Sequence, residues 1–453
     1  MKYVKTTVIG VLVGISIVGL VALLRADVPH VPSGAWNATG AMSQARAGAA
    51  ATLMGDGRVL VTGGLDATGA ASATAERYSP NGGQFLQTPP MSVARTAHTS
   101  TLLPDGRVLV AGGLGADGAA LSSAEIYDPV TNAWTGGLPL NTARSGHTAT
   151  AVPDGRVVIA GGDDGGTAIG SIEIYNPWSG TFTLSSGSIG ARTDHAAALL
   201  HDGKVLVAGG ISGTTLLAST VVYDPANDTL AAGPSLAVAR AGHSATTLLS
   251  GKVLVAGGAG AGGDLGSAEI YDPATGSFAG AGSMVTARQR HLAILLPHNN
   301  QVLIVGGMSG GAAATTAELY VPWQGTFTPT NAPNTSRTWA AAAALSFNAS
   351  QRVRGGPNDG LLLFAGGSTN ANATAPTASA ELYGFTTVRT DQADYSPGTK
   401  VVITGSGFAA GETVTLTLLE EPYLDTHTID PVVAGPDGSI YSDQFIPDED
   451  DLG

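Results

Sequence analysis

The chain has no cysteine among its 453 residues, and only 12% of its residues are charged. Without cysteine it cannot form a disulfide, a thiolate metal site or a cysteine nucleophile. The formal net charge is −14, and lysine and arginine form no cluster along the sequence. Nucleic-acid binding depends on basic side chains that neutralise phosphates, so we expect no nucleic-acid partner.

Charge is also missing from one long stretch near the N-terminus. Lys2 and Lys5 precede an uncharged, largely apolar run over residues 6–24, which Arg25 ends. A basic start followed by an apolar stretch indicates an export signal, and this run is close to the ~20 residues that span a bilayer. We therefore predict that residues 1–34 are a signal peptide or a signal anchor. The rest of the chain is then expected outside the cytoplasm, with the membrane contacted only through this segment.

What the sequence does contain is one unit repeated seven times. Each copy reads roughly Ala-Arg, a short apolar run, Asp-Gly, a second apolar run ending in Gly-Gly, and then Ala-Glu-x-Tyr. The paired glycines begin at Gly63, Gly112, Gly161, Gly209, Gly257, Gly306 and Gly366. A unit of this length buries its apolar faces only by stacking on its neighbours, so the sequence predicts a repeat architecture.

The second copy illustrates the secondary structure that we expect in each unit. Strands are predicted over residues 98–103, 108–111 and 124–127, with a fourth around Trp134. Asp105-Gly106 suits the tight turn of a hairpin, in which both central residues have positive φ. Four short antiparallel strands in one unit make the blade of a β-propeller.

The paired glycines, the tyrosine after glutamate and an aromatic residue seven positions later resemble the Kelch motif. That aromatic residue is Phe85, Trp134, Phe182, Phe278 or Phe327, and Leu230 replaces it once. The resemblance covers residues 35–386 and implies an all-β, seven-bladed Kelch-type β-propeller.

The spacing also indicates how the ring closes. Within the array, the fourth-strand aromatic residue lies ten positions before the next repeated arginine. The seventh unit has no such residue, but Trp36 lies ten positions before Arg46. We expect the strand around Trp36 to complete the last blade, which leaves no open sheet edge.

The pattern changes after residue 386. The stretch over residues 395–418 resembles the opening of a bacterial immunoglobulin-like module, which implies a spacer or stalk. Residues 387–453 are therefore expected to form an immunoglobulin-like β-sandwich. They are fewer than the ~100 residues of a complete sandwich, so we interpret the module as truncated.

Arginine, glutamate and histidine recur in nearly every unit and allow two interpretations. They could line a polar channel or a metal ring, or they could hold each blade together. We favour the structural role, because a residue repeated in every blade is explained most simply by blade structure. Single histidines in separate blades do not make a metal site, so we expect neither a metal nor another cofactor. The residues assigned to this structural role are Arg95, Arg144, Arg240, Glu125, Glu173, Glu269 and Trp36.

Function is expected where the repeat is broken. The position two residues after the repeated arginine is occupied in turn by Gly48, Ala97, Gly146, Asp194, Gly242, Arg290 and Trp339. In Kelch adaptor proteins a matching position contributes ligand-binding arginines, so the resemblance implies that Asp194, Arg290 and Trp339 line one site. A carboxylate, a guanidinium and an aromatic face suit a sugar or a charged peptide. Asp163 and Asp164 would lie in a loop on the same face. The alternative is three unrelated residues on the rim.

Three function classes remain open from the sequence. The first is an exported, non-enzymatic recognition or scaffold protein that binds a glycan or protein ligand, with no catalytic residues. The second is a Kelch-type sugar epimerase or mutarotase, with Asp194 or His195 as base and Arg290 holding a carboxylate. The third is a structural component of the cell envelope. The chain also resembles the copper radical oxidases in combining a propeller with an immunoglobulin-like module, but their cysteine–tyrosine cross-link cannot form here.

Overall fold

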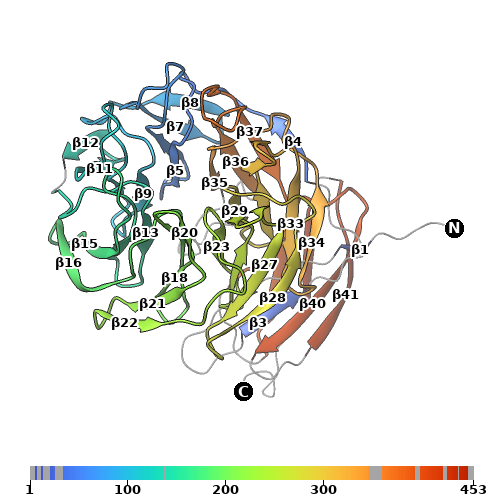
Figure 1. Cartoon of the computed structure of the whole chain (residues 1–453). Coiled ribbons are helices and arrows are strands. Elements are labelled where there is room, and N and C mark those ends of the chain that lie inside the picture. Colours follow the sequence, from blue (N-terminus) through green and yellow to red (C-terminus); the bar gives the residue numbers. More distant parts are fainter. Residues whose placement is uncertain are drawn as a thin grey trace.

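The computed structural model describes residues 34–136, 139–345, 360–392, 398–421, 426–436 and 438–446, together with three short strands within residues 1–33. The described part of the chain consists of strands and turns. Seven four-stranded antiparallel sheets, which we call blades 1 to 7 in chain order, surround a common axis (Figure 1). In each blade the first strand is innermost, and these inner strands neighbour one another around the ring.

The strands of each blade follow the chain from the axis outward, except in blade 7. Blade 1 contains β5 (Ala50–Leu53), β6 (Val59–Thr62), β7 (Ala75–Ser79) and β8 (Gln84–Gln87). Blade 2 contains β9 (Thr99–Leu102), β10 (Val108–Ala111), β11 (Ala124–Asp128) and β12 (Ala133–Gly136). Blade 3 contains β13 (Thr148–Ala151), β14 (Val157–Ala160), β15 (Ser171–Asn176) and β16 (Thr181–Ser188). Blade 4 contains β17 (Ala196–Leu199), β18 (Val205–Ala208), β21 (Thr220–Asp224) and β22 (Thr229–Ala232).

The remaining blades repeat this order. Blade 5 contains β23 (Ser244–Thr247), β24 (Val253–Ala256), β27 (Ser267–Asp272) and β28 (Ser277–Ser283). Blade 6 contains β29 (Leu292–Leu295), β30 (Val302–Val305), β33 (Ala317–Val321) and β34 (Thr326–Thr330). Blade 7 contains β35 (Ala341–Ala344), β36 (Leu361–Ala365), β37 (Ala380–Gly384) and, from the N-terminal side of the array, β4 (Trp36–Ala38).

Blades 4 to 6 each carry a small hairpin between their second and third strands. The hairpins are β19 (Ile211–Ser212) with β20 (Thr215–Leu216), β25 (Ala259–Gly260) with β26 (Gly263–Asp264), and β31 (Met308–Ser309) with β32 (Ala312–Ala313). They lie at the end of the ring where the Gly-Gly pairs and the starts of the inner strands meet, which we call the top face. The opposite end, with the Asp-Gly turns, is the bottom face.

The second strand of each blade forms the core of the propeller. Every residue of β6, β10, β14, β18, β24 and β30 is buried, because both faces of these strands pack against neighbouring blades. One apolar cluster, for example, joins Leu109 of blade 2 to Ile159 of blade 3. Fully burying one such side chain stabilises a fold by roughly 1.5–3 kcal/mol. This explains why these strands read as continuous apolar runs such as Val-Leu-Val-Ala.

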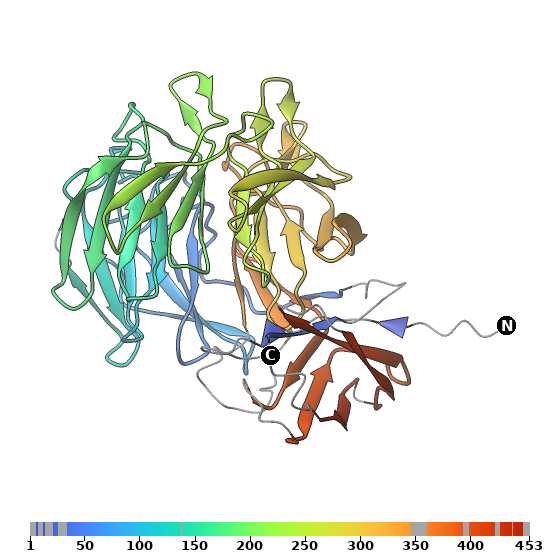
Figure 2. The ribbon, with the colours of Figure 1, turned by 90° about the horizontal axis from the view of Figure 1, so that it is seen from below.

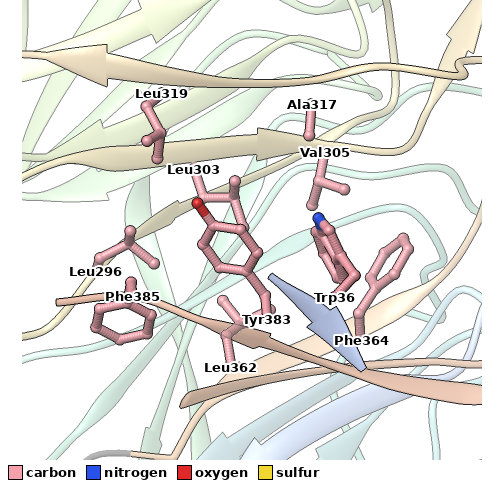
Figure 3. Packing of buried hydrophobic residues seen from close by; sticks show 10 residues of the cluster. All are labelled: Trp36, Leu296, Leu303, Val305, Ala317, Leu319, Leu362, Phe364, Tyr383 and Phe385. Carbon is pink, nitrogen blue, oxygen red and sulfur yellow. The ribbon is translucent and has the colours of Figure 1, made fainter. Parts of the chain in front are cut away.

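The N-terminal strand closes the ring, which confirms the prediction from the spacing. Strand β4 pairs antiparallel with β37, and Trp36 lies directly opposite Tyr383. Their ring centroids are 4.9 Å apart, and the Trp36 Nε1–H donates a hydrogen bond to the Asn331 carbonyl at 2.7 Å. Figure 3 shows both rings inside a cluster that also contains Phe364 of blade 7 and Leu303 of blade 6. Trp36 thus joins β4 to two blades at once.

The chain leaves the propeller from its bottom face, where the C-terminal strands lie (Figure 2). One sheet contains β38 (Thr387–Thr390), β39 (Val401–Ser406) and β42 (Ile440–Phe445). A second contains β40 (Thr413–Glu421) and β41 (Thr426–Val433), with β40 also paired to β1 (Thr6–Thr7) and β3 (Val21–Arg25), and β3 to β2 (Leu12–Val13). Hydrogen bonds attach this part to blade 6: Val388 N–H donates to the His298 carbonyl at 3.0 Å, and Asn299 Nδ2 donates to the Thr386 carbonyl at 2.7 Å and to Thr386 Oγ1 at 3.3 Å. The immunoglobulin-like assignment remains a prediction.

The predicted export segment falls mainly on residues outside the described part of the chain. Apart from β1, β2 and β3, the structure does not describe residues 1–33. Among the described residues there is no helix with the length and apolar character needed to cross a membrane. The signal or anchor therefore remains a prediction.

Replacing Trp36 with alanine should destabilise the propeller by about 3–5 kcal/mol, because it empties a buried site that holds both ends of the array together. Urea unfolding of the full chain measures this loss. Trp134→Ala is the matched control, since Trp134 forms the same tyrosine pair at 5.0 Å but lies partly exposed on a strand within the array. The control should lose less stability, and equal losses would contradict a special role for the closing strand.

Candidate functional site

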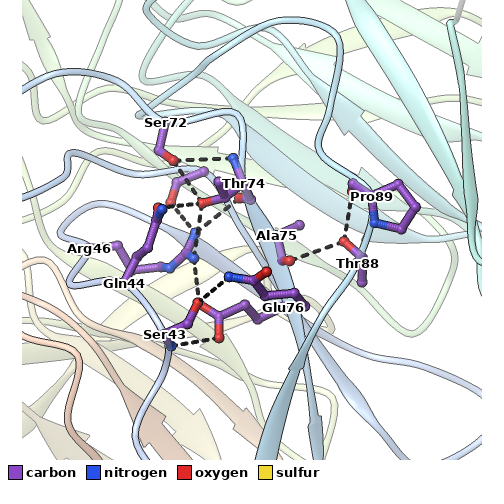
Figure 4. Close-up of polar contacts among 11 residues, drawn as sticks. Ser43, Gln44, Arg46, Ser72, Thr74, Ala75, Glu76, Thr88 and Pro89 are labelled. Carbon is purple, nitrogen blue, oxygen red and sulfur yellow. Dashed lines mark hydrogen bonds and ion pairs between the residues drawn. The ribbon is translucent and has the colours of Figure 1, made fainter.

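A buried arginine stands at the start of every blade. Figure 4 shows Arg46 of blade 1, whose Nη1 donates to the Gly63 carbonyl at 2.9 Å and whose Nη2 donates to Glu76 Oε1 at 2.7 Å. The Glu76 carboxylate also accepts a bond from the Ser43 N–H at 2.8 Å, so it holds the loop that enters the blade. Equivalent ion pairs are Arg95–Glu125, Arg144–Glu173, Arg240–Glu269, Arg288–Glu318 and Arg337–Glu381.

Blade 4 is the exception, because Val221 occupies the position of the glutamate. Arg192 is only 3% exposed and donates to the carbonyls of Gly209 and Ser219, both at 3.0 Å, and to Ser219 Oγ at 3.1 Å. No carboxylate among the described residues forms an ion pair with it. Burial lowers the pKa of the Arg192 guanidinium, with no acidic neighbour to oppose the shift.

The repeated histidines connect neighbouring blades. His147 Nε2 of blade 3 lies 2.9 Å from Thr99 Oγ1 of blade 2, and His195 Nε2 of blade 4 lies 3.1 Å from Thr148 Oγ1 of blade 3. The hydroxyl partners of these two rings belong to the preceding blade, so these histidines contribute to the contact between blades. The imidazole ring also helps to explain the first glycine in five of the seven pairs, namely Gly63, Gly112, Gly161, Gly209 and Gly257. A Cβ at Gly112 would lie 2.7 Å from His147 Cε1, closer than real Cβ contacts.

These imidazoles are buried and neutral. Burial, reinforced by the nearby arginine of the same blade, lowers the pKa of each to about 3. His195 is therefore not placed to act as the base that we considered for an epimerase. For His243 of blade 5, the hydroxyl position of the preceding blade is occupied by Ala196, and neither ring nitrogen of His243 has a hydrogen-bond partner in the described structure.

The residues two positions after each arginine lie together at the top face, around the axis. Backbone bonds join them across blades: Gly242 N–H to the Asp194 carbonyl at 2.8 Å, Arg290 N–H to the Gly242 carbonyl at 2.7 Å, and Gly48 N–H to the Trp339 carbonyl at 2.8 Å. All seven have positive φ, which glycine adopts freely and other residues rarely. This explains the glycines at this position.

Asp194, Arg290 and Trp339 keep this left-handed conformation with large side chains, at φ of 51°, 51° and 54°. Such a conformation costs of order 1–3 kcal/mol per residue, and observed strain of this kind supports a hypothesis of function. Asparagine and aspartate tolerate it best, so the arginine and the tryptophan are the more unusual cases.

The three side chains form one cluster. Arg290 Nη2 donates to Asp194 Oδ2 at 2.7 Å, and the Arg290 guanidinium carbon lies 4.7 Å from the centre of the Trp339 ring. The Trp339 Nε1–H donates to the Ala371 carbonyl at 3.3 Å. The ion pair is about one-third exposed on each side (34% for Arg290 and 35% for Asp194). Arg290 Nε and Nη1 have no hydrogen-bond partner in the described structure. The guanidinium is therefore oriented by protein groups and keeps free donors.

Asp163 and Asp164 do not join this cluster. The N–H groups of Gly165 and Gly166 donate to Asp163 Oδ1 at 2.8 and 2.7 Å, and the Thr167 N–H donates to Asp164 Oδ1 at 3.2 Å. Both carboxylates thus close their own turn, and in the described structure neither bonds Asp194, Arg290 or Trp339.

Sequence reasoning missed a second polar contact beside Arg290. Gln289 Nε2 donates to Asp264 Oδ1 at 2.7 Å, and the other oxygen of Asp264 accepts the Gly310 N–H at 2.7 Å. The contact joins the small hairpins of blades 5 and 6. The sequence does contain a signal for this contact. Gln289 is larger than the Ala, Thr or Ser that stands directly after the repeated arginine in the other blades.

The top face is acidic. Its loops and strand starts carry Asp66, Asp117, Asp163, Asp164, Asp194 and Asp264. Outside the buried arginine ring, Arg290 is the one Lys or Arg among the described residues of that face, and it is already paired with Asp194. Such a face repels polyanions and tolerates neutral or basic groups.

Comparison with known proteins supports the fold. The Kelch motif model matches residues 95–137 and 143–186. A fungal alcohol oxidase of the AA5 family, solved in complex with copper, is similar with a TM-score of 0.62 and 18% identity, covering 93% of this chain and 94% of that one. The structure of YjhT is similar with a TM-score of 0.51 and 16% identity, covering 64% of this chain and 99% of that one. The fold is a Kelch-type β-propeller. A search of curated proteins gave no match.

The residues present do not fit the copper chemistry of the fungal neighbour. The chain has no cysteine, and five of its histidines are buried between blades. Among the described residues, no three His, Asp or Glu side chains are grouped so that they could hold a metal. At 18% identity this likeness concerns the fold alone.

Replacing Arg144 with methionine should cost more stability than replacing Arg192. Arg144→Met leaves the buried Glu173 carboxylate without its cation, a loss of about 3–5 kcal/mol. Arg192→Met removes similar hydrogen bonds but leaves no unpaired charge. Chemical denaturation of both variants measures the difference, and equal losses would show that the ion pair itself matters little.

Stability should fall as the pH falls from about 6.5 toward 3. The unfolded chain protonates its histidines near pH 6.5, whereas the five buried imidazoles stay neutral down to about pH 3. Each therefore removes up to about 1.4 kcal/mol of stability per pH unit in this window. Denaturation at a series of pH values gives the slope of the unfolding free energy against pH. This slope should be smaller for His147→Gln, because that variant lacks one histidine that binds a proton on unfolding. The exposed His201→Gln is the control, and a change of slope there too would argue against the buried histidines as the cause.

Proposed function

We propose that this chain is an exported, non-enzymatic recognition protein that binds a glycan or protein ligand at the centre of its top face. The observation that carries the proposal is the cluster of Asp194, Arg290 and Trp339. The same position holds Gly or Ala in the other four blades. Three large side chains in a strained conformation, in contact and partly exposed, are more than the ring needs for its own stability.

Several features favour a glycan over a protein as the ligand. The cluster is small, and it combines free guanidinium donors, a carboxylate acceptor and a half-buried indole. Hydroxyl groups both donate and accept hydrogen bonds, and sugar rings pack on aromatic faces, so a saccharide matches this set. The six aspartates of the top face disfavour acidic sugars and acidic peptides, so a neutral or basic sugar is the ligand we expect. This differs from our first expectation that Arg290 would hold a carboxylate.

An epimerase or mutarotase receives less support. The Asp194 carboxylate already accepts a hydrogen bond from Arg290, and the pKa of buried His195 lies far below the range of a general base at neutral pH. The export part of the proposal rests on Lys2, Lys5 and the apolar run over residues 6–24. A stalk-like role of residues 387–453 belongs to the same proposal.

Binding of the purified full chain to an array of neutral, basic and acidic oligosaccharides, with a peptide library beside it, tests this function. We expect retention on neutral or basic sugars and a loss of tenfold or more with Arg290→Ala. Arg156→Ala is the matched control, because Arg156 forms a partly exposed ion pair with Asp154 at 2.6 Å on the bottom face. Binding that survives Arg290→Ala would contradict the proposed site, and selective peptide binding would replace the glycan by a protein.

A further inference from the structure

The side chain of Arg290 spans three blades. Its backbone belongs to blade 6, its guanidinium pairs with Asp194 of blade 4, and the residue of blade 5 between them is Gly242. The backbones of the three residues are linked in series by the hydrogen bonds from Gly242 to Asp194 and from Arg290 to Gly242. Arg290 therefore reaches its partner by passing Gly242.

The space beside Gly242 is filled by Arg290. A Cβ built on Gly242 would lie 3.1 Å from Arg290 Cγ, 3.7 Å from its backbone nitrogen and 3.8 Å from its Nε. The first distance is shorter than nine in ten real Cβ contacts, so Arg290 would have to shift by a few tenths of an ångström. No other residue contributes to the three nearest atoms.

The backbone alone does not require glycine here. Ala97 occupies the same position in blade 2 with φ of 52°, close to the 61° of Gly242. The fold therefore accepts a Cβ at this position. Blade 5 differs in the side chain that lies beside the glycine. At Gly146 of blade 3 the atom nearest to a Cβ would be Thr193 Oγ1 at 3.1 Å, whereas at Gly242 it is an atom of Arg290.

We infer that Gly242 is a positioning residue of the proposed ligand site. Its missing side chain leaves the path along which Arg290 lies between Trp339 and Asp194, with Nε and Nη1 left for a ligand. With a side chain at position 242, Arg290 leaves this path, and both the ion pair and the contact with Trp339 are weakened. This inference rests on the proposed function for its binding consequence, but its structural consequence is independent of any ligand.

The structural consequence is measured first. In the full chain with ¹⁵N-labelled arginine, the Arg290 Nε–H signal should be shifted by the indole ring of Trp339, and its absence from Arg290→Lys assigns it. We expect Gly242→Ala to move this signal toward the position of a free arginine. Gly146→Ala, with the same backbone conformation at φ of 58°, should leave it unchanged. An unchanged signal in Gly242→Ala would overturn the inference, whether or not the chain binds sugars.

Binding to the oligosaccharides retained by the native chain is measured second. Gly242→Ala should weaken binding about as much as Arg290→Ala, tenfold or more, and the double variant should show no additional loss. Gly146→Ala should bind as the native chain does. Full binding by Gly242→Ala, or additive losses in the double variant, would show that Gly242 does not act through Arg290. Native-like binding by Arg290→Ala itself would contradict the proposed function. The role of Gly242 in positioning Arg290 would then be tested by the NMR signal of Arg290 alone.

Discussion

A buried guanidinium at the start of each blade is the interaction on which the ring depends. It joins three pieces of chain that are far apart in the unit: the loop that enters the blade, the Gly-Gly pair after the second strand, and the glutamate of the third strand. Because its donors are arranged in a rigid fork, arginine can satisfy two carbonyls and a carboxylate at once, whereas lysine could not. At five of the seven pairs, the histidine of the following blade packs against the first glycine of the pair. At these sites, contacts within a blade and contacts between blades meet at one point.

Blade 4 departs from this scheme at three positions. Val221 replaces the glutamate, Ala196 replaces the hydroxyl that would bond His243, and Leu230 replaces the aromatic residue opposite Tyr223. The same blade carries Asp194. Stability in a repeat array is approximately a sum over units and their interfaces, so six well-bonded blades can hold one weaker member. The polar cluster at the top face supplies blade 4 with a different link, from Asp194 to Arg290 of blade 6.

Most of the fold could be predicted from the sequence, because each main contact recurs in most of the seven units. The spacing of Trp36 and Arg46 predicted the closing strand for the same reason, since it matched the interval found inside the array. The candidate site was harder to predict from the sequence. Which three residues break the repeat is visible in the sequence, but their mutual contacts depend on the direction of Arg290, which no pattern encodes. The separate turn of Asp163 and Asp164 and the contact of Gln289 with Asp264 depend on side chains of individual loops, which the repeat pattern does not specify.

The position two residues after each repeated arginine shows how one backbone conformation can serve both fold and site. A left-handed residue at the start of the inner strand lets the chain turn into the ring, and glycine meets that need at least cost. Where the chain instead places aspartate, arginine and tryptophan, the backbone stays the same and the side chains project at the centre of the top face. The fold therefore fixes where these groups stand, and the absent side chain of Gly242 leaves the space through which Arg290 extends. On this view glycine at position 242 belongs to the site as much as Arg290 does, because one supplies the donors and the other the room in which they are held.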